Sequence, residues 1–169
     1  PYNTKFIRPL AYGVVTSNYG PRNLSVASSS FHYGLDTGVA SGTNVYAPAD
    51  GIVTSVEWNS CSGNTLHLVH NINGEYYTTA YMHLSKINVS VGQTVYTNTV
   101  IAQSGNTGSC TTGAHLHFAI TKKARYVTAG MYGIPANQVY YSYADFTRYT
   151  IDPRSMISYP AVGGYFSGR

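Results

Sequence analysis

A series of short β-type runs, separated by turn residues, constrains the fold of this chain more than any other feature. Val, Ile, Thr and Tyr gather in the runs, whereas Gly, Asn, Asp and Ser lie between them, as at Asn73-Gly74. Such runs are typical of strands that bury one face. We expect strands at 14–16, 45–47, 51–58, 65–70, 76–83, 94–95, 100–104 and 115–121. The helical signal is limited to a turn near Ala144-Asp145-Phe146, so the sequence predicts a mainly β fold whose antiparallel sheets form a groove flanked by long loops.

The composition fits one β-rich domain. The chain has 169 residues, of which 43% are hydrophobic, so it can bury a sizeable core. We expect a single domain over 1–169, with a core at about 12–121 and a C-terminal extension at 122–169. Charged residues make up only 9% of the chain, and the 17 Tyr and 17 Gly favour strands and loops over helices.

Charge and hydropathy exclude two classes of partner. The net charge is +4, but basic residues are scattered, with one small cluster at Lys122-Lys123 and Arg125, so we expect no nucleic-acid partner. No stretch approaches the roughly 20 apolar residues of a membrane-spanning helix, so no membrane span is expected. The chain has no initiator Met and no secretory leader, which indicates a mature or excised domain of a larger protein.

The tripeptide His115-Leu116-His117 lies in one of the expected strands. Residues two apart on a strand project from the same face, so both histidines face one side and Leu116 faces the other, toward the core. Two imidazoles on one face can both bind one metal ion. Alternatively, one can bind the metal while the other transfers a proton.

A third histidine and a carboxylate are found upstream, in His32-Tyr33-Gly34-Leu35-Asp36. His32 and Asp36, with a small glycine between them, can converge across a bent turn, although Asp36 can equally cap a turn before Thr37-Gly38. Together the two pairs supply three histidines and one carboxylate. Hydrolytic zinc sites commonly use three protein ligands and one water, which leaves one histidine over.

Three further histidines, His67, His70 and His83, remain to be interpreted. His83 lies at the end of a strand rich in Tyr and Thr, where active-site groups often occur, although a hydrogen-bonded structural histidine is the alternative there. His67 and His70 are three apart on a strand and therefore face opposite sides. We interpret both as structural.

Taken together, these motifs resemble those of the lysostaphin/LytM-type zinc endopeptidases, peptidase family M23. The resemblance covers about 12–121 and depends on three motifs in the family's order: His32-x-x-x-Asp36, Tyr81-x-His83-Leu84-Ser85 and Gly113-Ala114-His115-Leu116-His117-Phe118. The segments 17–22, 42–53, 91–95, 104–108 and 151–153 also match. Ala114 replaces the family's usual Pro, Asn98 and Ala102 replace Gly, and the segment 122–149 is longer than usual.

The resemblance implies a chemistry and a substrate. His32, Asp36 and His117 would bind Zn²⁺ at the floor of the groove, while His83 and His115 would handle protons, with His115 favoured as the base. The substrate would be the peptide part of bacterial peptidoglycan, cut in cross-links or cross-bridges; the bond itself is left open. The enzyme would be a monomer acting at the cell wall outside the cell, as part of a secreted or phage-associated protein similar to prophage-type enterococcal wall endopeptidases.

Further residues acquire roles through the same resemblance. Tyr19 and Tyr81 become candidate donors to the oxyanion, although either can simply pack, and Arg22 becomes a candidate substrate contact or loop strut. The loops around Cys61 and Cys110 border one groove in the family, so a disulfide between these cysteines is expected; zinc ligation by the two thiols is disfavoured because they lack close spacing. The groove would be walled by the loops 19–31, 59–64, 85–89 and 105–114.

Two other function classes compete with the enzyme. Some proteins of this fold have lost site residues and act as wall-binding or hydrolase-activating modules. Here all five site positions are intact, which argues for catalysis. A purely structural or storage zinc site would leave His83 and His115 unexplained.

Overall fold

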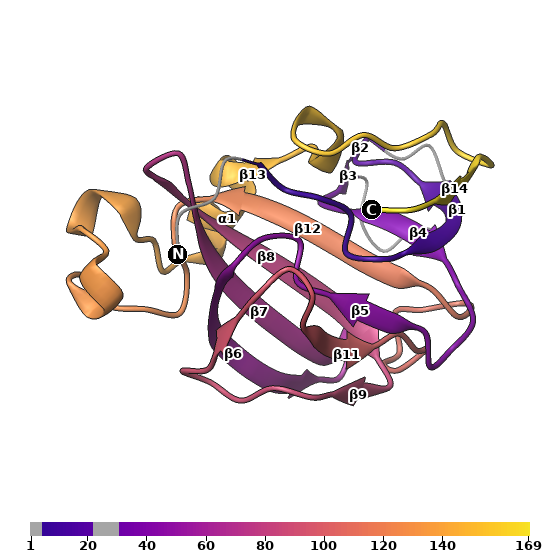
Figure 1. Ribbon diagram of the computed structural model, residues 1–169, viewed down its shortest axis with the longest axis horizontal. Helices are drawn as coiled ribbons and strands as arrows, with labels where there is room; N and C mark the ends of the chain where they lie inside the picture. Colours follow the sequence, from indigo (N-terminus) through magenta and orange to yellow (C-terminus); the bar gives the residue numbers. More distant parts are fainter. Residues whose placement is uncertain (1–4, 22–30) are drawn as a thin grey trace.

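The computed structural model describes residues 5–21 and 31–169, which form a mainly β structure (Figure 1). Its strands are β1 (Tyr12–Ser17), β2 (Gly20–Pro21), β3 (Phe31–His32), β4 (Leu35–Gly38), β5 (Asn44–Tyr46), β6 (Gly51–Asn59), β7 (Gly63–Ile72), β8 (Glu75–Leu84), β9 (Lys86–Ile87), β10 (Thr94–Val95), β11 (Val100–Gln103), β12 (Leu116–Lys122), β13 (Thr150–Ile151) and β14 (Tyr165–Ser167). Its helical elements are the 3₁₀ turns η1 (Met131–Gly133), η2 (Ala136–Gln138) and η3 (Pro153–Ser155), and the helix α1 (Tyr143–Tyr149).

Within the described residues the strands form one large sheet and two small ones. The main sheet has nine strands in the order β10-β6-β7-β8-β12-β4-β1-β14, with β13 added beside β12. Strands β5, β11 and β9 form a second sheet that lies in front of the main sheet in Figure 1, and β2 pairs with β3. Every strand pair is antiparallel, which confirms the predicted fold class.

Strand alternation divides the main sheet into a core face and an outer face. Leu116 and Phe118 of β12 join the apolar cluster that also contains Val45 of β5 and Ile101 of β11, so this core lies between the two sheets. His117, between those two core residues, must point to the opposite face. The site histidine and the core leucine of the predicted motif thus lie on the two faces of one strand.

The hairpin between β7 and β8 follows the turn signal read from the sequence. Asn73 and Gly74 have φ values of 54° and 90°, and the flanking Ile72 and Glu75 are paired. Two successive left-handed residues are the geometry that an Asn-Gly hairpin loop adopts. The tight turn fixes the register of the two longest neighbouring strands.

The strand predictions were mostly confirmed, but the N-terminal and C-terminal segments hold more structure than expected. All eight predicted strands are present, each within a few residues of its expected bounds. Six strands were missed: β2, β3, β4, β9, β13 and β14. The predicted turn near position 145 is a helix, α1, whose first turn is capped by Ser142 accepting a hydrogen bond from the Asp145 amide.

The segment expected to be an extension contributes to the sheet and to both apolar clusters. Strand β14 pairs with β1, and Ile157 and Phe166 join the main core. On the other face, Val127 and Ile134 pack in a smaller cluster with Val69 of β7. No helix in the described part of the chain is long and apolar enough to cross a membrane.

Candidate metal centre

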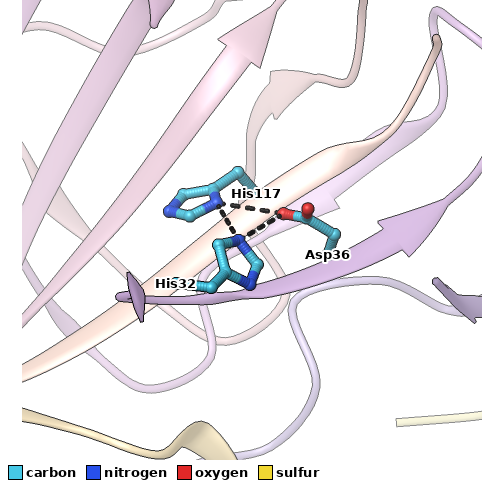
Figure 2. A group of neighbouring side chains, drawn as sticks. All are labelled: His32, Asp36 and His117. Atoms are coloured by element: carbon cyan, nitrogen blue, oxygen red, sulfur yellow. Dashed lines mark hydrogen bonds and ion pairs between the residues drawn. The ribbon is translucent and has the colours of Figure 1, made fainter. Parts of the chain in front are cut away.

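Three side chains from different strands converge on one point (Figure 2). Nδ1 of His117 lies 3.0 Å from Oδ1 of Asp36 and 3.1 Å from Nε2 of His32. Nε2 of His32 lies 3.3 Å from the same carboxylate oxygen. His32 is buried, and Asp36 and His117 are each 13% exposed. The predicted trio is thus brought together as a compact triangle of two imidazole nitrogens and one carboxylate oxygen.

Strand pairing positions two of these residues. Asp36 of β4 lies directly opposite His117 of β12, an arrangement that brings side chains on the same face into contact. His32 ends β3 and reaches the pair across the intervening Tyr33-Gly34. A Cβ at position 34 would stand 2.6 Å from Nε2 of His117, so glycine is the residue that lets the chain pass this close to the imidazole.

The dimensions of the triangle fit a tetrahedral metal ion. Three ligands that surround a zinc ion at about 2.0–2.2 Å lie about 3.3–3.6 Å from one another. The observed separations of 3.0, 3.1 and 3.3 Å are within a few tenths of an ångström of that geometry. Electron-rich atoms packed this closely repel one another unless protons or a cation lie between them. The donor set is therefore suited to a divalent cation.

The environment prepares His32 and Asp36 as ligands. Nδ1 of His32 donates a hydrogen bond of 2.8 Å to the Asn18 carbonyl oxygen, which leaves Nε2 with a lone pair directed at the centre of the triangle. Burial on its own would raise the pKa of Asp36, but the adjacent His117 and His32 imidazoles, when they carry a proton on the nitrogen that faces Asp36, outweigh it and hold that pKa well below its ordinary value. Asp36 is therefore ionised near neutral pH.

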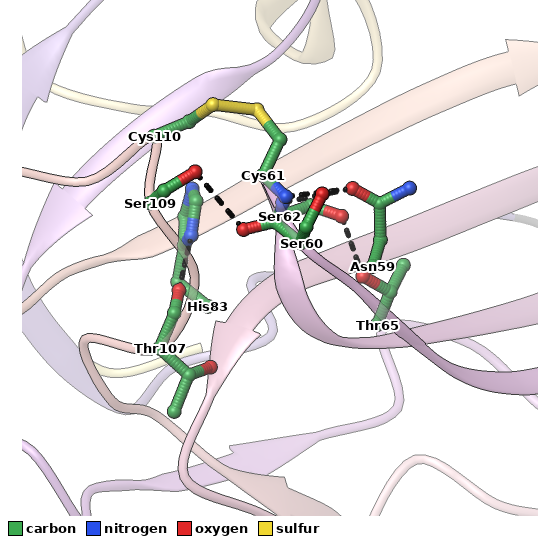
Figure 3. The surroundings of a disulfide bond; sticks show 9 residues. All are labelled: Asn59, Ser60, Cys61, Ser62, Thr65, His83, Thr107, Ser109 and Cys110. Atoms are coloured by element: carbon green, nitrogen blue, oxygen red, sulfur yellow. Dashed lines mark hydrogen bonds between the residues drawn. A yellow bond between two sulfur atoms is a disulfide. The ribbon is translucent and has the colours of Figure 1, made fainter.

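Two further imidazoles lie beside the triangle, both held through Nδ1. Nδ1 of His115 donates to the Gly113 carbonyl oxygen at 2.7 Å, and Nδ1 of His83 donates to that of Thr107 at 2.8 Å (Figure 3). The His83 and His115 ring centroids are 4.9 Å apart, and Nε2 of His115 lies 3.8 Å from Oδ1 of Asp36. Burial lowers the pKa of His83 more than its bond with Thr107 raises it. Both rings keep Nε2 for other partners.

The conformation of His83 explains why Tyr81, a candidate oxyanion donor, does not face the site. In a regular strand, Tyr81 and His83 would share a face, but His83 has a φ of 62°, beside an irregularity in the β7–β8 register. Its side chain therefore turns onto the face of Met82, while Tyr81 stays fully buried against Phe118. The structure supports the alternative that Tyr81 simply packs and not its role as an oxyanion donor, because its hydroxyl is hydrogen-bonded to that of Thr79 inside the core.

A disulfide joins the two loops on one side of the site (Figure 3). Cys61 is bonded to Cys110, and backbone hydrogen bonds run from Ser109 to Ser60 and from Cys110 to Cys61. Gly108 approaches the Cys61 carbonyl group so closely that no side chain would fit there. The clamped loop also carries the Thr107 and Gly113 carbonyl groups that hold His83 and His115.

The site lies in a cleft to which three of the four predicted loops, 19–31, 59–64 and 105–114, contribute residues. The cleft is lined by Phe31, His32, Tyr33, Asp36, Cys61, Ser62, Met82, His83, Cys110, His115, His117, Tyr143 and Phe146. No residue of the predicted wall 85–89 is among them. The helix α1 contributes Tyr143 and Phe146 instead, and no local sequence signal indicates this, because only tertiary packing brings α1 to the site.

The remaining candidates lie elsewhere. The Tyr19 hydroxyl donates to the Thr150 carbonyl oxygen at 3.3 Å and is not among the cleft residues, so the structure does not support an oxyanion role for Tyr19. Arg22 falls outside the described residues. His70 is buried in contact with Phe6, whereas His67 is buried on the other face against Tyr126.

Comparison with known proteins places this geometry in a family. The sequence profile of Peptidase family M23 matches residues 30–129, more than half of the chain. The peptidoglycan DD-endopeptidase ShyA of Vibrio cholerae is 38% identical over 72% of this chain and 28% of its own length. The glycyl-glycine endopeptidase ALE-1 of Staphylococcus capitis is 42% identical over 59% of this chain and 27% of its own length. The chain thus spans little more than a quarter of these relatives.

Solved structures of similar proteins have the same fold as this chain. LytU has a TM-score of 0.64 and 35% identity, covering 85% of this chain and 83% of its own. A zinc-containing peptidase from Vibrio cholerae has a TM-score of 0.63 and 36% identity, covering 71% and 37%. The catalytic domain of the prophage-encoded M23 protein EnpA from Enterococcus faecalis, in a mutant form, has a TM-score of 0.55 and 27% identity, covering 66% and 82%. With its family profile, its relatives and its fold in agreement, the chain belongs to peptidase family M23.

Proposed function

We propose that this chain is a zinc-dependent endopeptidase that hydrolyses peptide bonds in the cross-links or cross-bridges of bacterial peptidoglycan. The observation that carries the proposal is the pairing of two groups of side chains in one cleft. A triangle of metal-type ligands, His32, Asp36 and His117, adjoins two imidazoles, His83 and His115, that are not needed as ligands. A purely structural or zinc-storage site would not require this second pair of imidazoles.

Zinc is the metal that suits this donor set best. Two imidazole nitrogens and one carboxylate oxygen form the three-ligand shell of many catalytic zinc sites, in which a fourth position stays open. A bound Zn²⁺ would supply a water of lowered pKa and would polarise the scissile carbonyl group. His32, Asp36 and His117 would hold the ion, and the carbonyl oxygen of Asn18 would keep His32 in the ligating tautomer.

The two free imidazoles would move the protons. We assign His115 as the acceptor of the proton from the attacking water, because its Nε2 lies 3.8 Å from the Asp36 oxygen that would hold the ion. The same proton then passes to the leaving amine. His83, 4.9 Å away between ring centroids, would stabilise negative charge on the carbonyl oxygen when it is itself protonated.

The substrate assignment rests on the relatives. ShyA is named as a peptidoglycan DD-endopeptidase and ALE-1 as a glycyl-glycine endopeptidase. Both names describe cleavage of an internal peptide bond, and the name of ShyA adds peptidoglycan as the substrate. Both relatives are far longer than this chain. We therefore propose that the chain acts at the bacterial cell wall, outside the cell, as the catalytic domain of a larger secreted or phage-associated protein.

Release of new amino groups from cell walls tests the proposal. Zinc-loaded protein would be incubated with purified sacculi carrying direct cross-links and with others carrying glycine bridges, with and without a chelator. We expect chelator-sensitive release from at least one wall type, and mass spectrometry of the fragments would identify the bond. The His115→Ala variant is the matched control for contaminating hydrolases. Zinc-loaded protein that binds walls without releasing amines would instead indicate a wall-binding or hydrolase-activating module.

A further inference from the structure

A continuous run of aromatic rings forms one wall of the cleft. Phe31 and Tyr33 lie 4.7 Å apart between ring centroids, and Tyr33 contacts Phe146 of α1 at 5.8 Å. Tyr143, one turn earlier on α1, stacks on Phe146 at 5.6 Å with an angle of 26° between the rings. All four rings line the same cleft as the metal centre. We call Phe31, Tyr33, Phe146 and Tyr143 the aromatic wall.

The two rings that α1 contributes to the aromatic wall differ in their freedom to meet a ligand. Phe146 is buried and is held by Tyr33, by Tyr143 and by the Arg125 guanidinium 5.5 Å from its ring centroid. Tyr143 is 64% exposed, although its ring rests on Phe146. A large aromatic ring that faces water at the rim of a cleft is free to bury its face against a ligand.

The helix that carries Tyr143 and Phe146 lies outside the part of the chain that matches the family. The profile ends at residue 129, whereas α1 spans Tyr143–Tyr149. The helix is nevertheless docked onto the sheet beside the site, where the Ser142 cap and the Arg148–Asp145 ion pair stabilise its short length. Two rings of the wall, Tyr143 and Phe146, therefore come from a segment beyond the family profile, whereas Phe31 and Tyr33 lie within it.

The chemistry of the lining selects a class of ligand. Among the described residues that line the cleft, Asp36 is the sole acidic side chain, and none is Lys or Arg. A substrate carboxylate lying along this wall would lose water without gaining a cationic partner among the described side chains that line the cleft, which is unfavourable. Amide planes and short apolar side chains, in contrast, stack on aromatic rings without such a cost.

We propose that Tyr143, supported by Phe146, is a specificity-determining residue that binds the uncharged peptide segment next to the scissile bond. This inference rests on the proposed function, because the occupant of the cleft is the peptide substrate of that reaction. The wall lines the same cleft as the metal centre, so a chain whose carbonyl group reaches the metal comes close to it. Tyr143 would act through binding and would leave the metal and the proton transfers unchanged.

Kinetics of Tyr143→Ala and Tyr143→Phe would test the inference, with Tyr141→Ala as a matched control. Tyr141 is also 64% exposed and lies two residues away, but it does not line the cleft. The substrate would be a synthetic dimer of two wall stem peptides joined by their cross-link, with the free carboxylates amidated. For Tyr143→Ala we expect KM to rise about three- to tenfold, with kcat and zinc content unchanged. Tyr143→Phe, which keeps the ring, should behave as the unmodified protein, as should Tyr141→Ala.

A binding measurement separates failure of this inference from failure of the proposed function. Affinity for the same dimer would be measured by calorimetry on zinc-loaded protein carrying His115→Ala, with and without Tyr143→Ala. A three- to tenfold loss of affinity supports the inference even if no wall is cleaved. Equal affinity of the two proteins overturns it, even if the unmodified protein is an active peptidase. A loss in Tyr143→Phe as large as that in Tyr143→Ala also overturns it, because the ring would then not be the binding element.

Discussion

Gly34 lies against the imidazole of His117, so closely that a Cβ at position 34 would stand 2.6 Å from both Cε1 and Nε2 of that ring. The same Cβ would stand 2.8 Å from the Phe118 carbonyl oxygen. Neither neighbour can retreat easily, because β4 and β12 are paired directly at Asp36 and His117. The glycine between His32 and Asp36 is therefore part of the geometry that forms the metal centre.

Substitution Gly34→Ala should weaken metal binding without removing a ligand. The added methyl group must push the His117 ring away from Asp36, and displacement of a ligand's supporting contacts typically lowers metal affinity about 10- to 100-fold. Competition with a chromogenic zinc chelator would measure the change. Gly38→Ala is the matched control on the same strand, because its Cβ would meet only the Thr16 methyl group, at 3.1 Å, and a backbone oxygen at 3.6 Å. Equal affinities of the two variants would contradict the prediction.

The two histidines of the His-x-His motif should respond differently to alanine. His117→Ala removes a corner of the ligand triangle and should leave the purified protein with little zinc. His115→Ala removes a ring that is held by the Gly113 carbonyl oxygen and lies outside the triangle, so zinc should be retained while turnover falls at least about 100-fold. Metal analysis beside an amine-release assay distinguishes the two. Full zinc occupancy in both variants would show that the ligand assignment is wrong.

The disulfide should contribute to stability more than to metal binding. It closes a loop with a sequence separation of 49 residues, for which chain entropy gives about 4 kcal/mol, and measured values are typically about 2–4 kcal/mol. The variant with Cys61→Ser and Cys110→Ser should lose a comparable free energy of unfolding in a denaturant titration but keep its zinc, because no ligand lies on the clamped loops. Alkylation without reductant followed by mass measurement provides the check: two labelled thiols in the unmodified protein would contradict the bond.

Local signals account for the parts of the fold that could be predicted. Alternating β-branched residues and the Asn73-Gly74 turn act over a few residues, so the sequence predicted β7 and β8 and the hairpin between them. Strand β4 was missed because Leu35-Asp36-Thr37-Gly38 has no such pattern. It is a strand because β12 and β1 flank it on both sides, a tertiary condition that the segment itself does not encode.

The same difference between local signals and tertiary packing explains which site residues could be predicted. The spacing of His32 and Asp36 and the His-x-His motif supplied three candidate histidines and one carboxylate, because both depend on short-range geometry. The choice of His117 over His115 as the third ligand came from the family resemblance. Tyr81 was misplaced because the alternation breaks at His83, whose left-handed backbone turns its side chain to the other face. Tyr143 was not foreseen because its place at the cleft arises from the docking of α1.

A buried histidine on the outer face of the sheet predicts how stability depends on pH. Burial, assisted by the nearby Arg125 charge, lowers the pKa of His67 to about 3, from 6.5 in an exposed histidine. The unfolded chain therefore binds a proton below pH 6.5 that the folded protein does not accept until about pH 3. Burial of neutral His67 therefore does not lower the free energy of unfolding above pH 6.5. Below that value it lowers the free energy of unfolding by about 1.4 kcal/mol for each pH unit.

Substitution His67→Phe should remove this penalty, because phenylalanine has no proton to bind and can keep the ring contact with Tyr126, whose centroid lies 4.6 Å away. It also removes a buried nitrogen, Nδ1, that has no hydrogen-bond partner, so no native bond of that atom is lost. Denaturant titrations between pH 6 and pH 4 should give a free energy of unfolding that falls less steeply for the variant, by about 1.4 kcal/mol per pH unit. Both proteins would be stripped of metal, so that the ligand residues contribute equally to both curves. Parallel curves would mean that His67 takes up its proton in the folded state, and that burial does not keep it neutral.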